Sequence, residues 1–94
     1  GRWQKFYVAE VGATAERVRP IVGRHKAYLA ASGRRARIVR SGGKPSFLSV
    51  LHVAPAPDSP HHSHVFVHLQ TGRFHQIRVM LAALGAPLVG DAGA

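Results

Sequence analysis

Four stretches of the chain alternate apolar and polar side chains with the period of two that is typical of β-strands. In PSFLSVLHV, for example, the alternation places Leu48, Val50 and His52 on one face of a strand. Glycine or proline lies close to the ends of these stretches, which favours turns between them. The predicted strands are residues 3–11, 34–40, 45–53 and 63–70.

A helix is predicted near the C-terminus, where apolar residues recur at helical spacing. Thr71 is predicted to be its N-cap, because a threonine oxygen can accept a hydrogen bond from a backbone N–H two or three residues later. Gly85 and Pro87 predict its end, since glycine suits the position after a helix and proline prevents continuation. The apolar stripe consists of Ile77, Met80, Leu81 and Leu84.

The remaining segments are predicted to connect these elements. A helical turn can follow Thr14, and Pro20 ends it. Residues 23–35 are basic and punctuated by glycine and serine, which favours a loop or an irregular insertion, and residues 54–62 form a proline-rich loop. The predicted fold is α+β, a mainly antiparallel mixed sheet with a C-terminal helix, in one domain of residues 1–94.

The charge of the chain is one-sided and narrows the choice of partner. Lysine and arginine number 13 against 4 acidic residues, and 11 of the basic residues lie at or before Lys44. Such a field favours a polyanion, with nucleic acid ahead of an anionic membrane. No apolar run is long enough to span a bilayer, and the chain has no cysteine for a disulfide or a thiolate metal site. A reducing, cytoplasmic location is therefore expected.

Arg73 is an unusual choice at the start of the predicted helix. The first turn of a helix carries partial positive charge, which disfavours a cation there by about 0.3–1 kcal/mol. A nearby carboxylate or phosphate would compensate. An arginine that points into water would also be tolerated at little cost, and the residues alone support the two interpretations equally.

Three segments, in order along the chain, resemble motifs of the RluA-like pseudouridine synthases. LQTGRFHQIRVMLAALGAPLVGD, residues 69–91, is similar to the family motif T-G-R-x-H-Q-I-R-x-H-x-x-x-L-G-x-P-I-x-G-D, with Met80 in place of the second histidine. KFYVAEVGA resembles the K-x-Y-x-A-x-V-x-G strand, and GKPSFLSVLHV resembles the G-K-x-A-x-T strand that follows it. Together they run from Lys5 to Asp91 and correspond to roughly the second half of the catalytic domain.

The resemblance implies an enzyme that isomerises uridine in rRNA or tRNA without a cofactor. It implies that Arg73 pairs with the nucleophilic aspartate, that Tyr7 stacks on the target uracil, and that Ile77 and Leu81 line or support the pocket. The family's aspartate loop, H-R-L-D-x-x-T-S-G, does not occur in these residues, and neither Asp58 nor Asp91 is a substitute. The 94-residue chain alone is therefore expected to be inactive.

A structured RNA, rRNA or tRNA, is the expected partner, and basic residues are expected to hold its phosphates. If about six of them neutralise phosphates, binding should weaken as salt is added. A plot of the logarithm of the binding constant against the logarithm of the salt concentration should then have a slope near −5. The residues predicted to contact RNA are Lys5, Arg34, Arg35, Arg37, Arg40, Lys44, His75, Gln76 and Arg78. Further candidates for the phosphate contacts are Arg17, Arg19, Arg24 and Lys26.

Other functions compete with this interpretation. A degenerate synthase half that keeps its basic face would be a non-enzymatic RNA-binding module. A zinc site would need three or four convergent ligands, and although His61, His62, His64 and His68 are close in sequence, no metal site is expected. A membrane-surface binder is disfavoured because the basic residues do not follow a helical period. Marginal stability is expected, since a partial sheet leaves an edge and a core face uncovered.

Overall fold

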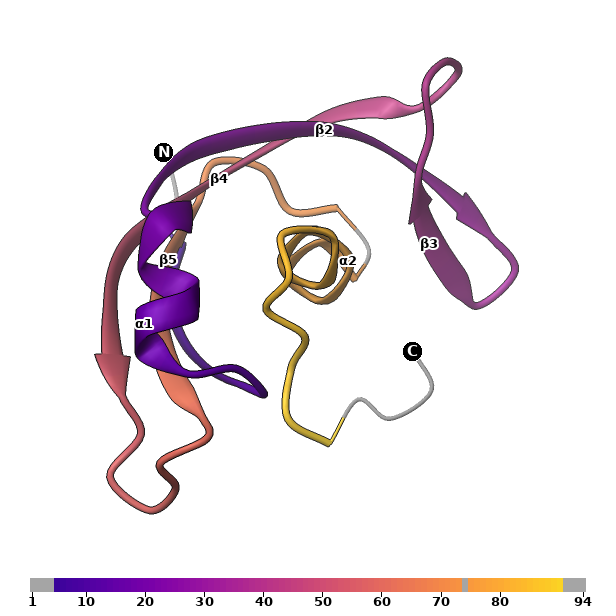
Figure 1. Cartoon of the computed structure of the whole chain (residues 1–94). Coiled ribbons are helices and arrows are strands. Elements are labelled where there is room, and N and C mark those ends of the chain that lie inside the picture. The colour runs from indigo at the N-terminus through magenta and orange to yellow at the C-terminus, as the bar shows by residue number, and fades with distance from the viewer. Residues whose placement is uncertain (1–4, 74, 91–94) are drawn as a thin grey trace.

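The computed structural model describes residues 5–73 and 75–90, and it contains one five-stranded sheet with short helices (Figure 1). The strands lie in the order β1-β5-β4-β2-β3, and every neighbouring pair is antiparallel. This confirms the predicted α+β class with an antiparallel sheet. The strands are β1 (Lys5–Val11), β2 (Gly23–Ser32), β3 (Arg35–Ile38), β4 (Lys44–Pro55) and β5 (Ser63–Leu69). The helices are α1 (Ala15–Val18), the 3-10 turn η1 (Arg19–Ile21) and α2 (Gln76–Ala83).

The sheet curves around α2, which lies on its concave side (Figure 1). Alternate side chains of the strands point to this side and form one apolar cluster with the buried stripe of α2. Ala15 and Val18 of α1 join the same cluster. The side chains that are most deeply buried include Val11, Leu48, Val50, Val65, Val67 and Leu81. In the part of the chain that the structure describes, no helix is both long and apolar enough to cross a membrane.

The predictions for the first turn and for two of the strands are confirmed. Thr14 caps α1 by accepting a hydrogen bond from the backbone N–H of Arg17 at 3.3 Å, and Pro20 follows in η1. In β5, the alternation buries one side-chain set, as the sequence predicts. β1 begins at Lys5, and the two earlier residues of the predicted strand lie outside the described residues.

The prediction that residues 23–35 form a loop was wrong. Residues Gly23–Ser32 are the strand β2, which pairs with β4 on one side and β3 on the other. Its inward set includes Leu29, and its outward set includes Arg24, Lys26 and Tyr28. The basic side chains obscured an ordinary strand alternation, because long cations can occupy the solvent face of a sheet. Gly33, with a φ of 61°, lies in the tight turn to β3.

A β-bulge in β4 overturns the predicted position of His52. The register with β5 shifts between Val50 and His52, so that Leu51 and His52 are both exposed and Val53 becomes the next buried residue. An extra residue in one strand reverses the faces of those that follow it. His52 therefore lies beside Phe66 on the convex face, with ring centroids 5.5 Å apart.

The predicted N-cap of the C-terminal helix was also wrong. α2 begins at Gln76, its N-cap is His75, and no side chain caps it. Thr71 instead joins the sheet, where its Oγ1 accepts a hydrogen bond from the backbone N–H of Phe47 at 3.0 Å. Gly85 has the expected left-handed conformation after the helix, with a φ of 85°.

Gly43 lies just before β4, where its backbone comes close to the backbone of β2. A Cβ at this position would lie 2.6 Å from Cγ2 of Val39 and 3.0 Å from the backbone of Tyr28 and Leu29. We therefore expect Gly43→Ala to lower the free energy of unfolding by about 1–3 kcal/mol, as overpacking does elsewhere. Urea unfolding followed by circular dichroism would measure it, with Gly12→Ala as the control, because the nearest atom to a Cβ there is 3.8 Å away. Equal midpoints for the two variants would contradict the prediction.

Candidate active site

The strand β1 carries the first residue that the sequence places in the site. Tyr7 points to the concave side and is 45% exposed, at the edge of the sheet. It lines an open groove of about 640 Å³ together with residues from β5, α2 and the segment between them. The principal lining residues are Tyr7, Leu69, Arg73, Gln76, Ile77 and Leu88. The fold therefore brings Tyr7 and Arg73, which are distant in sequence, to one groove.

Arg73 is half-buried and lies before α2, so it is not in the first turn of that helix. Its Nε and Nη2 both donate hydrogen bonds to the carbonyl oxygen of Pro45, at 3.3 and 2.9 Å. The dipole argument from the sequence does not apply to this arrangement. The compensating acceptor that the structure supplies is a backbone carbonyl at the start of β4.

Gln76 holds the segment around Arg73 in place. Its side-chain Oε1 accepts hydrogen bonds from the backbone N–H of Arg73 at 3.0 Å and from the hydroxyl of Thr71 at 2.8 Å. Its Nε2 donates to the carbonyl oxygen of Phe47 at 2.9 Å. Only 2% of the residue is exposed, so the predicted place of Gln76 on a polar rim facing RNA was wrong. The amide ties the helix start to β4 instead.

His75 marks local backbone strain at the start of α2. Its φ of 53° and ψ of 26° lie in the left-handed region, and it is the only non-glycine residue with positive φ among residues 5–73 and 75–90. Histidine tolerates this region better than most residues, yet the conformation still costs free energy. This left-handed residue changes the direction of the chain between the Thr71–Arg73 segment and α2. Strain of this kind often lies at ligand sites.

The basic hairpin β2–β3 forms a second cavity with α2. Arg34, Arg35 and Arg37 line this cavity of about 630 Å³ from one side. His75 and Arg78 line it from the helix, and none of its lining residues is acidic. A cavity lined by one sign of charge concentrates ligands of the opposite sign, so the charges of this cavity favour an anion over a cation.

The other predicted site residues make fewer defined contacts with the groove. Lys5 is exposed on β1, and its Nζ lies 3.6 Å from where a Cβ on Gly72 would lie, beside the Arg73 segment. Arg40 is exposed before β4, and Lys44, its first residue, is exposed too. Ile77 is half-buried in the groove, whereas Leu81 is fully buried in the core.

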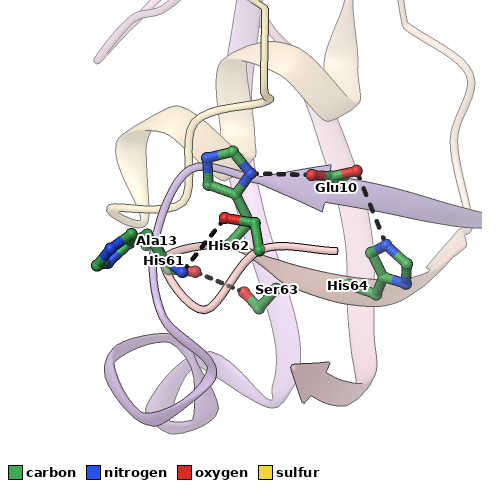
Figure 2. Close-up of polar contacts among 7 residues, drawn as sticks. Glu10, Ala13, His61, His62, Ser63 and His64 are labelled. Carbon is green, nitrogen blue, oxygen red and sulfur yellow. Dashed lines mark hydrogen bonds and ion pairs between the residues drawn. The ribbon is translucent and has the colours of Figure 1, made fainter. Parts of the chain in front are cut away.

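The histidines near the loop between β4 and β5 contact an acidic residue (Figure 2). His62 Nδ1 lies 2.9 Å from Glu10 Oε2, and His64 Nε2 lies 3.8 Å from Glu10 Oε1. The hydroxyl of Ser63 between them is buried and donates to the carbonyl oxygen of Ala13 at 2.8 Å. Within the described ranges, no three or more His, Cys, Asp or Glu side chains are arranged to hold a metal ion.

Several known proteins are similar to the chain in sequence. The ribosomal large subunit pseudouridine synthase D of Vibrio vulnificus (strain CMCP6) is 39% identical over 71 residues, which are 76% of this chain and 19% of that protein. The protein of the same name from Buchnera aphidicola subsp. Acyrthosiphon pisum (strain APS) is 41% identical over 58 residues, or 62% of this chain and 18% of that protein. No family model matches the sequence.

A solved structure shares the fold. Human RNA Pseudouridylate Synthase Domain Containing 1 superposes with a TM-score of 0.66 and 29% sequence identity, covering 94% of this chain and 39% of that one. The chain is homologous to the RluA-like pseudouridine synthases. It spans less than a fifth of the length of the curated relatives above, 18% and 19%. The family resemblance seen in the sequence is thus confirmed, while the roles of individual residues stay predictions.

Proposed function

We propose that the chain is the C-terminal portion of the catalytic domain of an RNA pseudouridine synthase. The observation that carries the proposal is the groove that joins Tyr7 to Arg73, since the homologous family implies catalytic roles for both. Its proposed substrate is uridine in rRNA or tRNA, its proposed location is the cytoplasm, and its reaction requires no cofactor.

The proposed reaction breaks the bond between N1 and C1′, rotates the uracil and joins C5 to C1′. The uridine must first leave its stack, at a cost of a few kcal/mol. An aromatic face such as Tyr7 can recover about 1–3 kcal/mol per base by stacking. The arginines of the hairpin and Arg78 would hold the adjacent phosphates, and their charge raises the local concentration of RNA.

The nucleophilic carboxylate has to come from residues outside these 94. Asp58 is exposed in the loop between β4 and β5 and does not line the groove. A guanidinium near a carboxylate favours its ionised form. The Arg73 guanidinium contacts the Pro45 carbonyl and lines the groove, which supports the proposal that it receives this carboxylate.

The test is to sequence the transcript upstream of the codon for Gly1 and to assay the complete protein. We expect an in-frame H-R-L-D-type loop, and we expect the complete protein to form pseudouridine in tRNA or rRNA, which chromatography of the nucleosides separates from uridine of equal mass. The 94-residue chain, assayed in parallel, should form none. An open reading frame without an aspartate loop, whose product binds RNA but leaves uridine unchanged, would instead establish the non-enzymatic RNA-binding module.

A further inference from the structure

The convex face of the sheet carries a second ordered set of side chains. Strand register places Phe6 opposite His68, His68 opposite Ser49, and Ser49 opposite Arg24. These four residues form a row across β1, β5, β4 and β2. In the next row Phe47 is opposite Lys26. We call this surface the outer platform: Phe6, His68, Ser49, Arg24, Phe47, Lys26 and the adjoining Gln70.

One aromatic ring of the outer platform is exposed, and the rings of Phe47 and His68 are half-buried. Phe6 is 60% exposed, and its ring stacks on His68 with centroids 4.6 Å apart and planes 16° from parallel. The imidazole is also held from its far side, since Gln70 Nε2 lies 3.1 Å from its Nδ1 and 3.0 Å from the Ser49 hydroxyl. A single exposed aromatic would require no explanation. A stacked and hydrogen-bonded pair is a preformed surface for another flat ring.

Cations complete the platform. The guanidinium carbon of Arg24 lies 4.6 Å from the centroid of the Phe47 ring, and Lys26 Nζ lies 5.6 Å from the same centroid. Both cations come from β2 and are exposed. A guanidinium stacked on a ring offers its other plane to a base, and an ammonium beside it can bind phosphate.

The acidic side chain on the same face lies at the other end of the sheet. Glu10 is opposite His64, four residues along β1 from Phe6, and contacts His62 as well (Figure 2). The convex face is therefore basic at the end that carries Phe6, Arg24 and Lys26. A polyanion is attracted to that end.

We propose that the outer platform binds a single-stranded segment of RNA by base stacking and phosphate contacts. Neighbouring bases of a duplex are stacked on one another, so an exposed ring on the convex face selects unpaired bases. Successive residues of a strand point to opposite faces, which places Phe6 on the side of the sheet away from Tyr7 and its groove. The platform is thus a second RNA site, and it does not depend on the proposed isomerase activity.

Fluorescence anisotropy can test this with the 94-residue chain and an unstructured uridine oligomer of about ten nucleotides, within the usual site size. Phe6→Thr should raise the Kd by about tenfold, which corresponds to the loss of one stacked base. Arg24→Ala should raise it more than Arg24→Lys, which keeps the charge at the same exposed position and serves as the charge control. Val22→Thr, 49% exposed and outside the strands, is the apolar control.

Crosslinking the unaltered chain to the same oligomer carrying 4-thiouridine gives a readout that requires no variant. Crosslinks located on the side chains of Phe6, Phe47 or His68, and not on the neighbouring groove residues Tyr7 and Leu69, support the proposal. Crosslinks confined to α2 and the β2–β3 turn, or equal Kd values for Phe6→Thr and Val22→Thr, overturn it. Loss of these crosslinks in the complete protein overturns it as well, because another segment of that protein would then cover the platform.

Discussion

Replacing Gln76 by leucine should lower the free energy of unfolding by about 2–4 kcal/mol, although the two side chains are similar in size. The Gln76 amide makes three hydrogen bonds within the protein, to Thr71, Arg73 and Phe47, and the residue is 2% exposed. Leucine would leave the backbone N–H of Arg73 without this partner, whereas the Phe47 carbonyl would keep the backbone N–H of Gln70 at 3.2 Å. An unsatisfied buried polar group costs about 1–3 kcal/mol.

Gln70→Leu is the matched control for this experiment. Gln70 is exposed, and water can replace its hydrogen bonds to Ser49 and His68. Its effect on stability should stay within about 0.5 kcal/mol, as for most surface substitutions. Urea unfolding of both variants under the same conditions separates the two cases. Equal midpoints would mean that water solvates the groups around Gln76, and that the start of α2 is not fixed by this amide.

The parts of the fold that could be predicted from the sequence have local signals. The alternation in β5 and the apolar stripe of α2 are visible because their buried sets are valines, leucines and a methionine. β2 has the same alternation, but its outward set is largely cationic and its inward set includes small residues such as Ala27, so the apolar contrast is weak. The partner strand β4, more than ten residues away, is what fixes β2 as a strand.

The start of α2 could not be predicted because it is set by contacts that are remote in sequence. Threonine is a residue type that is common at N-caps. The Thr71 hydroxyl oxygen nevertheless accepts a hydrogen bond from the backbone N–H of Phe47, which is 24 residues earlier. A tertiary hydrogen bond competes with the local cap, and the helix begins only after the left-handed turn at His75. The bulge that moves His52 to the convex face leaves no comparable mark in the sequence.

The candidate site, like the fold, could be predicted from the sequence only in part. The family resemblance implied that Tyr7 and Arg73 belong to one site, and the groove contains both. The contact between Arg73 and the Pro45 carbonyl spans 28 residues, and that between Gln76 and Phe47 spans 29. Neither can be inferred from local pattern. They fix the positions of Arg73 and of the buried Gln76, which both line the groove.

Arg73→Lys should reduce the kcat of the complete synthase by about 10²–10³-fold, the effect of removing one preorganised electrostatic contact elsewhere. This prediction depends on the proposed function. The planar guanidinium now directs two nitrogens, Nε and Nη2, at one oxygen of Pro45, and the same fork can receive a carboxylate in two parallel hydrogen bonds. A lysine ammonium keeps the charge but loses this geometry, so the reacting carboxylate would be misaligned.

The measurement is the rate of pseudouridine formation at saturating RNA, together with the Kd for the same RNA. Arg19→Lys is the control, since Arg19 is exposed in η1 and does not line the groove. We expect kcat to fall while the Kd changes little, because the net charge is preserved and phosphate contacts depend mainly on charge. A Kd that rises in proportion to the loss of kcat would make Arg73 an RNA-binding residue. An unchanged kcat would remove Arg73 from the reacting centre and leave it as the residue that joins the start of β4 to the start of α2.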